Sequence, residues 1–481
     1  MIDNIERLKK SLKSIWGYED FRAPQGEIIA SLLQGKDSLT VMPTGGGKSL
    51  CFQLPALLNT GLTLVISPLI ALIENQVQEL KQKQLPADFL HSEISQINKK
   101  KIFQRIKNQD LRLLYLSPET LLSKPVWEAI TPPSIVINGL IIDEAHCLVE
   151  WGNTFRPAYT RLGAVRPTLL KFKPHQSQIA IASFTATADE YTQKTIIKTL
   201  KLHQPQKFLI TPYRSNLQLN VKQIWTPKAR KKEVINFLIK KQEKSGLIYL
   251  RTRKEAENIS HWLNSLGYKN RPYHGGLPSG EKRQIETDWL AEKINFVVST
   301  NAFGMGINKS NVRWILHYQV PLFLSAYIQE IGRGGRDGKP AEVLSLISEC
   351  TGFFEPTDKN RRNFLLNQTI QQYLKTRRIS KKIPLQGNVF SNSNYQLYLS
   401  ILFSSEQLQW LDPFNYRIKP NNIDYKIKQL INQEKQSVKK MQEYLVTKKC
   451  RWAFLLESFG FSISSSFSCG VCDNCVRKKR I

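Results

Sequence analysis

Two successive sets of short apolar runs, separated by longer helical stretches, constrain the fold of this chain more than any other feature. The runs are nearly continuous rather than alternating, as expected of parallel strands that are covered on both faces. Because strands that alternate with helices form doubly wound α/β domains, two sets predict two such domains, divided near Pro212. The predicted strands are 39–42, 62–67, 113–117, 140–143 and 179–185 in the first set, and 247–250, 296–299, 312–318 and 343–347 in the second.

Charge and hydropathy narrow the class of protein. The chain of 481 residues carries 69 Lys and Arg against 39 Asp and Glu, a formal net charge of +30. Such a positive field favours polyanions such as nucleic acid, although a generally basic proteome is an alternative that one sequence leaves open. The longest apolar run, 62–73, is shorter than the roughly 18 residues that span a bilayer, and the N-terminus has no signal-peptide core. We therefore predict a soluble, non-secreted, cytoplasmic protein, nucleoid-associated if bacterial, with no membrane partner.

A glycine-rich loop follows the first predicted strand and predicts a phosphate site. Its backbone N–H groups can surround phosphate oxygens, while Lys48 reaches the β- and γ-phosphates and Ser49 binds Mg²⁺. Met42 stands where the strict P-loop pattern has its first glycine, so the loop matches the helicase form Pro-Thr-Gly-x-Gly-Lys-Ser instead. The loop residues predicted to bind ATP are Thr44, Gly45, Gly46, Gly47, Lys48 and Ser49.

Acidic and basic motifs complete this prediction. Asp143 and Glu144 end an apolar strand, where Asp143 can hold Mg²⁺ and Glu144 can orient and deprotonate the attacking water. In the second α/β half, Arg333 and Arg336 are three residues apart, so one helical face could direct both toward a γ-phosphate. The pattern predicts an ATP site built at the interface between two domains.

The strings FRAPQ, PTGGGKS, DEAHC, SFTATA, YHGGL, STNAFGMGINK and QEIGRGGRDG follow one another along the chain. In this order and wording they resemble the superfamily 2 helicases, and most closely the RecQ DNA helicases, over about residues 10–350 and again over 440–475. The resemblance implies ATP-driven translocation on single-stranded DNA and 3′-to-5′ unwinding of duplexes and their junctions with single strands, in repair or recombination. This sequence departs from the family pattern at three places. They are the aromatic-rich loop after the DEAH box, Ser215, and Arg251, where the family usually has Asn.

The resemblance also implies roles for individual residues. Tyr18 and Arg22 would sandwich the adenine ring and Gln25 would hydrogen-bond its edge. The positions that match the family's phosphate chemistry are Lys48, Ser49, Asp143, Glu144, Gln329, Arg333 and Arg336. His146 would couple the ATP site to DNA, and the other positions predicted to bind DNA are Trp151, Phe155, Arg156 and His274.

Four of the seven cysteines crowd into the last 32 residues and predict a metal site. In a chain predicted to be intracellular, a Cys-x-x-Cys-x-x-Cys turn after one more distant cysteine suits four thiolates around a tetrahedral Zn²⁺. Because four protein ligands leave no open position, the predicted zinc is structural. The ligands are Cys450, Cys469, Cys472 and Cys475, in a stretch that resembles the RecQ zinc domain.

The predicted domains are two RecA-like motors at 1–208 and 209–350, a basic connector at 351–425 and a helical zinc-binding domain at 426–481. Six residues follow Cys475, so we expect no C-terminal winged-helix or HRDC module. Within the connector, 394–404 reads as an amphipathic helix, and 407–411 with 415–418 reads as a short hairpin. Two interpretations stay open. The insert is a small winged-helix-like unit with Phe414 or Tyr416 near its tip, or a spacer in which Trp410 and Phe414 pack against the motor.

The predicted function is that of a monomeric ATP-dependent DNA helicase of the RecQ type that uses ATP, Mg²⁺ and structural Zn²⁺. One alternative is a translocase or annealing ATPase that does not separate strands. Another is a non-catalytic DNA-binding scaffold with a decayed ATPase, although the sequence retains Lys48, Asp143 and Arg336.

Overall fold

The computed structural model of the chain describes residues 2–150, 156–241, 244–303, 309–349, 352–419 and 422–478. Two compact units are present: unit 1 contains residues 1–210 and 371–430, and unit 2 contains 211–370 and 431–481. The four sequence segments named above stay a prediction. Among the described residues, no helix is both long enough and apolar enough to cross a membrane.

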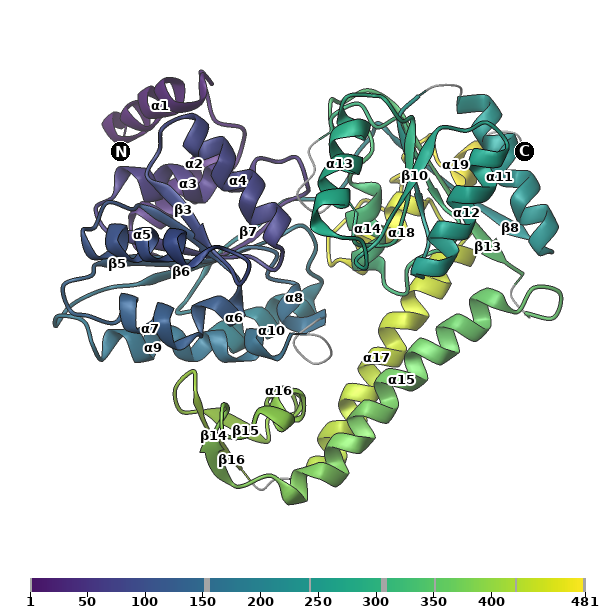
Figure 1. The fold of residues 1–481 in the computed structure, drawn as a ribbon. Coiled ribbons are helices and arrows are strands. Elements are labelled where there is room, and N and C mark those ends of the chain that lie inside the picture. The colour runs from purple at the N-terminus through teal and green to yellow at the C-terminus, as the bar shows by residue number, and fades with distance from the viewer. Residues whose placement is uncertain are drawn as a thin grey trace. The chain divides into compact units, whose positions relative to one another are not determined.

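Unit 1 contains a parallel sheet with helices packed on its faces (Figure 1). Its strand order is β3-β4-β2-β5-β6-β1-β7, and separate apolar clusters fill the space on either side of the sheet. The strands are β1 Ser38–Val41, β2 Leu62–Ile66, β3 Ala87–Leu90, β4 Leu113–Leu116, β5 Ile137–Ile142, β6 Ala180–Thr185 and β7 Gln206–Leu209. The helices of this part are α1 Ile2–Trp16, α2 Gln25–Leu33, α3 Lys48–Leu58, α4 Ile70–Gln82, α5 Gln96–Lys107, α6 Pro118–Leu121, α7 Lys124–Ile130, α8 Cys147–Glu150, η1 Pro157–Ala164, α9 Val165–Leu170 and α10 Glu190–Leu200.

Unit 2 contains a second parallel sheet, of order β10-β11-β9-β12-β13-β8. Its strands are β8 Leu217–Ile224, β9 Gly246–Tyr249, β10 Asn270–Tyr273, β11 Phe296–Ser299, β12 Trp314–His317 and β13 Ala341–Ser348. The helices that alternate with them are α11 Pro227–Lys241, α12 Arg253–Ser265, α13 Ser279–Leu290 and α14 Leu324–Ile331. The prediction of two doubly wound parallel-sheet domains is confirmed.

Every predicted strand is present, with ends shifted by a few residues. The strands that the sequence prediction omitted are β3, β7, β8 and β10, and these are the edge strands of the two sheets. An edge strand is covered on fewer sides, so its sequence need not be continuously apolar. The Asn-Arg-Pro-Tyr sequence of β10 illustrates this, since Arg271 is exposed while Tyr273 is buried.

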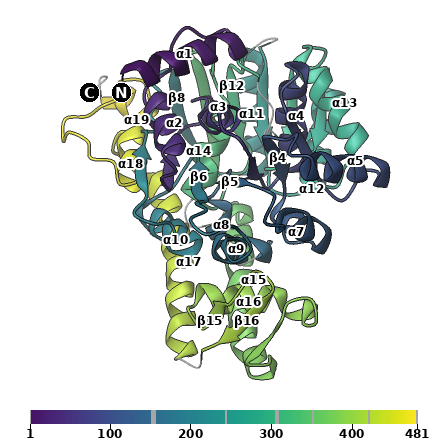
Figure 2. The same cartoon turned by 90° about the vertical axis from the view of Figure 1, so that its left-hand side faces the viewer.

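The helix and hairpin predicted in the insert are also present, as α16 Gln396–Ser404 with β15 Leu408–Trp410 and β16 Asn415–Ile418. A third strand, β14 Gln386–Asn388, completes an antiparallel sheet of order β14-β16-β15, and α16 lies beside β15 (Figure 2). Short 3₁₀ turns, η2 Ser380–Lys382 and η3 Ser393–Tyr395, join these elements. The small apolar core of the insert includes Ala164, so it closes against the motor part of unit 1.

The aromatic residues suggested for a wing tip both pack against other side chains. Tyr416 is fully buried in the core of the insert. Phe414 joins the apolar core of the motor and meets Trp127 edge to face, with ring centroids 5.1 Å apart. Trp410 is buried in the apolar cluster of the insert, which also contains Ala164 of the motor. The packing of Phe414 favours the spacer interpretation, and the burial of Tyr416 leaves it no exposed ring for a wing tip. Phe414 lies in the hairpin turn as predicted, and the wing interpretation stays a prediction.

Two long helices flank the insert and lie side by side, α15 Thr357–Ile379 and α17 Ile423–Val446 (Figure 1). An ion pair of 2.5 Å between Arg377 Nε and Asp424 Oδ1 joins the end of one helix to the start of the other. The last helices, α18 Arg451–Ser458 and α19 Asp473–Lys478, belong to unit 2 and share its main apolar core through Trp452 and Leu455.

Candidate nucleotide site and metal centre

The glycine-rich loop of unit 1 joins the end of β1 to the start of α3. Gly45 and Gly47 have φ values of 84° and 82°, a region that favours glycine. A Cβ atom on Gly47 would lie 2.4 Å from Nε2 of Gln25, and one on Gly46 would lie 2.7 Å from Cγ of Met42. No side chain caps α3, so the N–H groups of its first turn are directed toward the loop. The geometry is that of an anion site.

Gln25 connects the loop to the N-terminal segment predicted to bind adenine. Its Nε2 donates to the carbonyl of Gly46 at 2.9 Å, and its Oε1 accepts from the backbone N–H of Arg22 at 3.0 Å. The side chains of Tyr18 and Arg22 are exposed. The structure thus brings Gln25 to the phosphate loop, and leaves Tyr18 and Arg22 accessible nearby along the chain.

The carboxylates of the DEAH box meet the lysine of the loop. Glu144 follows β5 with a left-handed φ of 49°, and its Oε1 lies 3.9 Å from Nζ of Lys48. The neighbouring Asp143 is buried, and its Oδ1 accepts the backbone N–H of Glu144 at 3.0 Å. Burial raises the pKa of Asp143, the Glu144 carboxylate raises it further, and Lys48 opposes both. A buried pair of carboxylates is suited to a divalent cation, whose charge removes this penalty.

His146 links the DEAH box to the next strand. Its Nδ1 lies 3.1 Å from Oγ1 of Thr185 and 3.3 Å from Oε2 of Glu144. The hydroxyl of Thr185 in turn donates to the carbonyl of Thr187 at 3.0 Å. The Ser-Phe-Thr-Ala-Thr string at 183–187 is therefore hydrogen-bonded to His146, which in turn contacts Glu144, the predicted water-activating residue.

The aromatic-rich loop is only partly described. Trp151 and Phe155, both predicted to bind DNA, lie outside the described residues. Arg156 is described, and its Nη1 lies 3.5 Å from Oε2 of Glu119.

The predicted arginine residues lie in unit 2, together with Gln329. Gln329 is in the last turn of α14, which ends at Ile331, so Arg333 and Arg336 follow in a turn rather than on one helical face as predicted. The glycines at 332, 334 and 335 explain this end, because glycine favours turns over helix. Arg333 is buried and Arg336 is partly buried.

His274, the remaining residue predicted to bind DNA, is also buried in unit 2. Its Nε2 lies 2.8 Å from Oε1 of Glu257, and its Nδ1 accepts the backbone N–H of Gly276 at 3.2 Å. Nδ1 thus holds the turn after β10, and Nε2 joins it to α12.

The sequence prediction did not include Glu330, an acidic residue of α14 next to Gln329. Glu330, between Gln329 and Ile331, is buried and contacts both Arg251 and His317. The signal was available in part, since Glu330 lies inside the Gln-Glu-Ile-Gly-Arg string. Its partners could not be read from spacing, because they come from the ends of two other strands.

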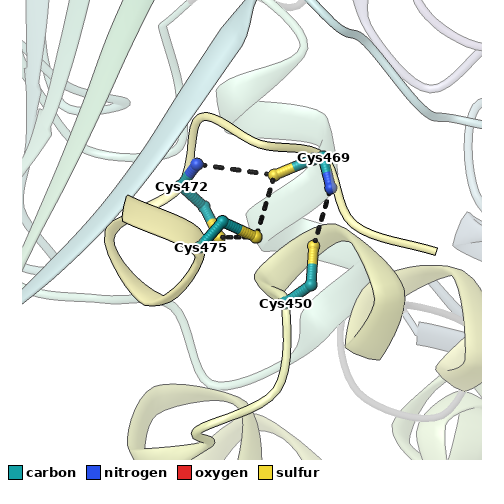
Figure 3. A group of neighbouring side chains, drawn as sticks. All are labelled: Cys450, Cys469, Cys472 and Cys475. Atoms are coloured by element: carbon teal, nitrogen blue, oxygen red, sulfur yellow. Dashed lines mark hydrogen bonds between the residues drawn. The ribbon is translucent and has the colours of Figure 1, made fainter. Parts of the chain in front are cut away.

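The cysteine cluster brings the four predicted ligands together (Figure 3). All four sulfur atoms lie within 4.8 Å of one another. Cys475 Sγ is 3.4 Å from Cys472 Sγ and 3.8 Å from Cys469 Sγ. Four thiolates about 2.3 Å from one tetrahedral Zn²⁺ lie about 3.8 Å apart, so the observed spacing fits this metal.

Backbone and side-chain donors orient these thiols. The N–H of Cys469 donates to Sγ of Cys450 at 3.3 Å, and the N–H of Arg451 donates to Sγ of Cys472 at 3.5 Å. The hydrogen bond with Cys469 is the main cause that lowers the pKa of Cys472. Asp473 anchors the cluster to the sheet, because its carboxylate pairs with Arg451 at 2.6 Å and accepts the N–H of Val221 at 3.0 Å.

Comparison with family models matches three segments of the chain. Residues 22–218 match the DEAD/DEAH box helicase family, 229–338 match the helicase conserved C-terminal domain, and 420–476 match the RecQ zinc-binding family.

Whole-chain relatives agree with these segments. The chain is 47% identical over 476 residues to "ATP-dependent DNA helicase RecQ" of Synechocystis, covering 98% of each chain. It is 38% identical over 347 residues to the protein of the same name from Haemophilus influenzae, covering 72% of this chain and 53% of the relative. In fold it is similar to S. cerevisiae Dbp5 bound to RNA and ADP BeF3, with a TM-score of 0.59, 16% identity, and coverage of 75% of this chain and 92% of that one.

Proposed function

The chain belongs to the RecQ family of ATP-dependent DNA helicases, and from this we propose that it moves 3′ to 5′ along single-stranded DNA and separates duplex strands, in DNA repair or recombination. The observation that carries the proposal is the contact chain from Lys48 through Glu144 and His146 to Thr185. These contacts join the phosphate loop to the end of β6 at Thr185. A motor that couples ATP hydrolysis to movement requires such a connection.

The residues of unit 1 bind the nucleotide and activate water. Backbone N–H groups of the loop and Nζ of Lys48 bind the β- and γ-phosphates. Ser49 and Asp143 would hold Mg²⁺, which neutralises the charge that develops on the phosphate oxygens. Glu144 accepts a proton from the attacking water. Its left-handed backbone directs the carboxylate toward Lys48, and therefore toward the phosphates.

The residues of unit 2 and the N-terminal segment complete the site in this proposal. Arg333 and Arg336 stabilise the transition-state charge, with Gln329 beside them. The adenine ring stacks between Tyr18 and Arg22, which are exposed and available for this contact.

We assign DNA contact to His146, Trp151, Phe155, Arg156 and His274. Aromatic faces that stack on bases are tolerant of sequence, as a translocating protein needs. The buried His274, held at both nitrogens, would act by fixing the turn that follows β10.

The cysteine cluster holds a structural Zn²⁺ in this proposal. Its four sulfurs match a tetrahedral site with no open position. We further propose that the protein acts as a monomer in the cytoplasm or nucleoid.

The proposal is tested by DNA-stimulated ATP hydrolysis and by strand displacement on a 3′-tailed duplex. Lys48→Ala should lower the rate of hydrolysis by about 10²- to 10³-fold and abolish displacement, because a phosphate-binding charge is lost. The matched control is Lys228→Ala, an exposed lysine of unit 2. Equal rates in wild type and Lys48→Ala would refute the ATPase. ATP hydrolysis without displacement would instead favour the translocase alternative, and an RNA duplex serves as the second substrate.

A further inference from the structure

Arg251 stands directly after β9 and forms a paired ion contact with α14. Its Nη1 lies 2.6 Å from Oε1 of Glu330, and its Nη2 lies 2.7 Å from Oε2 of the same carboxylate. Both side chains are largely buried, with 12% and 5% of their surfaces exposed. A two-point contact between planar groups fixes orientation as well as distance.

The guanidinium is itself held in place by the segment after β12. Nε of Arg251 donates to the carbonyl of Gln319 at 3.0 Å, and its backbone N–H donates to Oε1 of Gln319 at 3.0 Å. The Nε2 of Gln319 donates to Glu255 at 2.6 Å, at the start of α12. The contacts with Gln319 therefore fix the position of the Arg251 guanidinium independently of Glu330.

A histidine completes the environment of the carboxylate. Nε2 of His317 lies 3.0 Å from Oε2 of Glu330, and its Nδ1 lies 3.1 Å from Oγ of Ser345. Nε2 of His317 therefore faces the carboxylate, and Nδ1 faces the hydroxyl of Ser345. Burial raises the pKa of Glu330, but Arg251 and His317 outweigh it and hold the pKa at about 2.

The same strand end also reaches Arg333. Tyr249, the last residue of β9, lies near Arg333, whose positive charge opposes the effect of burial on the pKa of the tyrosine. Arg251 thus contacts Glu330 of the Gln-Glu-Ile-Gly-Arg string, and Tyr249 lies near Arg333 of the same string. Gln329 directly precedes Glu330 in the chain.

We propose that Arg251 is a positioning residue of the motor, whose paired contact with Glu330 fixes the end of α14 and with it the orientation of Gln329 and Arg333 for ATP hydrolysis. The inference rests on the proposed role of Arg333. A shorter amide side chain at position 251 would lack the length and charge with which the guanidinium reaches Glu330. A lysine keeps the charge but provides a single point of contact.

A purely structural ion pair is the competing explanation, and a double variant separates the two. Arg251→Ala leaves Glu330 buried without its cation, so a loss of activity could reflect unfolding. Arg251→Leu combined with Glu330→Gln removes both charges, and keeps an acceptor for His317. This protein should melt within a few degrees of wild type if packing is the only requirement.

The measurement is steady-state ATP hydrolysis with saturating single-stranded DNA, for the double variant and for Arg251→Lys. We expect kcat to fall roughly 10- to 100-fold, with KM for ATP within about twofold, since misplacement rather than lost binding is the cause. The control removes a more exposed ion pair of unit 1, as Arg105→Leu with Asp88→Asn, and should keep the wild-type kcat. A folded double variant, or Arg251→Lys, with kcat within twofold of wild type overturns the inference.

Arg333→Ala distinguishes this failure from failure of the proposed function. If Arg333→Ala hydrolyses ATP at the wild-type rate, the role of Arg333 is wrong and the inference falls with it. If Arg333→Ala is inactive and the double variant is fully active, only the positioning role of Arg251 is wrong.

Discussion

Replacing Phe414 by alanine should loosen the insert from the motor of unit 1. Phe414 lies in the turn between β15 and β16 and packs against the motor core, edge to face with Trp127. The carbonyl of the preceding Pro413 accepts a hydrogen bond of 3.3 Å from Nη1 of Arg161. Glu406 adds a salt bridge to Lys198 of α10. The phenyl ring is the main apolar contact of this turn with the motor.

The expected loss follows from the burial of the ring. Truncating a fully buried phenylalanine costs about 3–5 kcal/mol, and Phe414 is only partly buried, so about half of that applies. Loss of the edge-to-face contact with Trp127 contributes about 1 kcal/mol. We expect unit 1 to lose about 2.5–3.5 kcal/mol of unfolding free energy.

Urea unfolding measures the loss, and hydrogen exchange localises it to residues 386–418. Phe390→Ala is the matched control, because this ring stacks on Phe414 at 5.7 Å but is 56% exposed. The control should lose less than about 1 kcal/mol. An unchanged urea midpoint for Phe414→Ala, together with lost strand displacement, would contradict this reasoning and restore the wing interpretation.

Two further predictions concern unit 2. Because Arg251 and His317 hold the pKa of Glu330 at about 2, below its ordinary 4.5, the stabilisation from this group is present above about pH 4.5 and is lost as the pH falls toward 2. Glu330→Gln should reduce the pH dependence of the urea midpoint between pH 6 and 3, and an equally steep dependence would contradict the assignment. For the metal, we expect about one Zn²⁺ per chain and a lower melting temperature for Cys472→Ser, since the cluster shares the core of Trp452 and Leu455. A zinc-free protein with the wild-type melting temperature would exclude a structural site.

The central strands of both sheets could be predicted because burial on both faces demands continuous apolar sequence. The edge strands could not, since β7 and β10 carry polar residues that meet solvent. The phosphate loop, the DEAH box and the cysteine ligands were all predicted because their chemistry requires particular residues at short spacing. The paired contact of Glu330 was not predicted, because Arg251 and His317 are distant in sequence and only the fold joins them.

The insert shows a different limit of sequence reasoning. Its helix and hairpin follow from local patterns, but their role depends on which faces are covered. Alternating residues predicted the hairpin without revealing that Phe414 would turn toward Trp127. The same aromatic residue in a turn fits an exposed wing or a packing contact, and only the neighbouring surface decides between them.

The docked insert also holds the two long helices that flank it, α15 and α17. Helices α15 and α17 each begin in one unit and end in the other, because the division falls at 370/371 and again at 430/431. A helix of 23 residues is about 35 Å long and resists bending, whereas an unstructured linker does not. The contacts of Phe414, Pro413 and Glu406 hold the far ends of both helices to the motor of unit 1. We therefore expect Phe414→Ala to loosen the ends of α15 and α17 that belong to unit 1, as well as the insert itself.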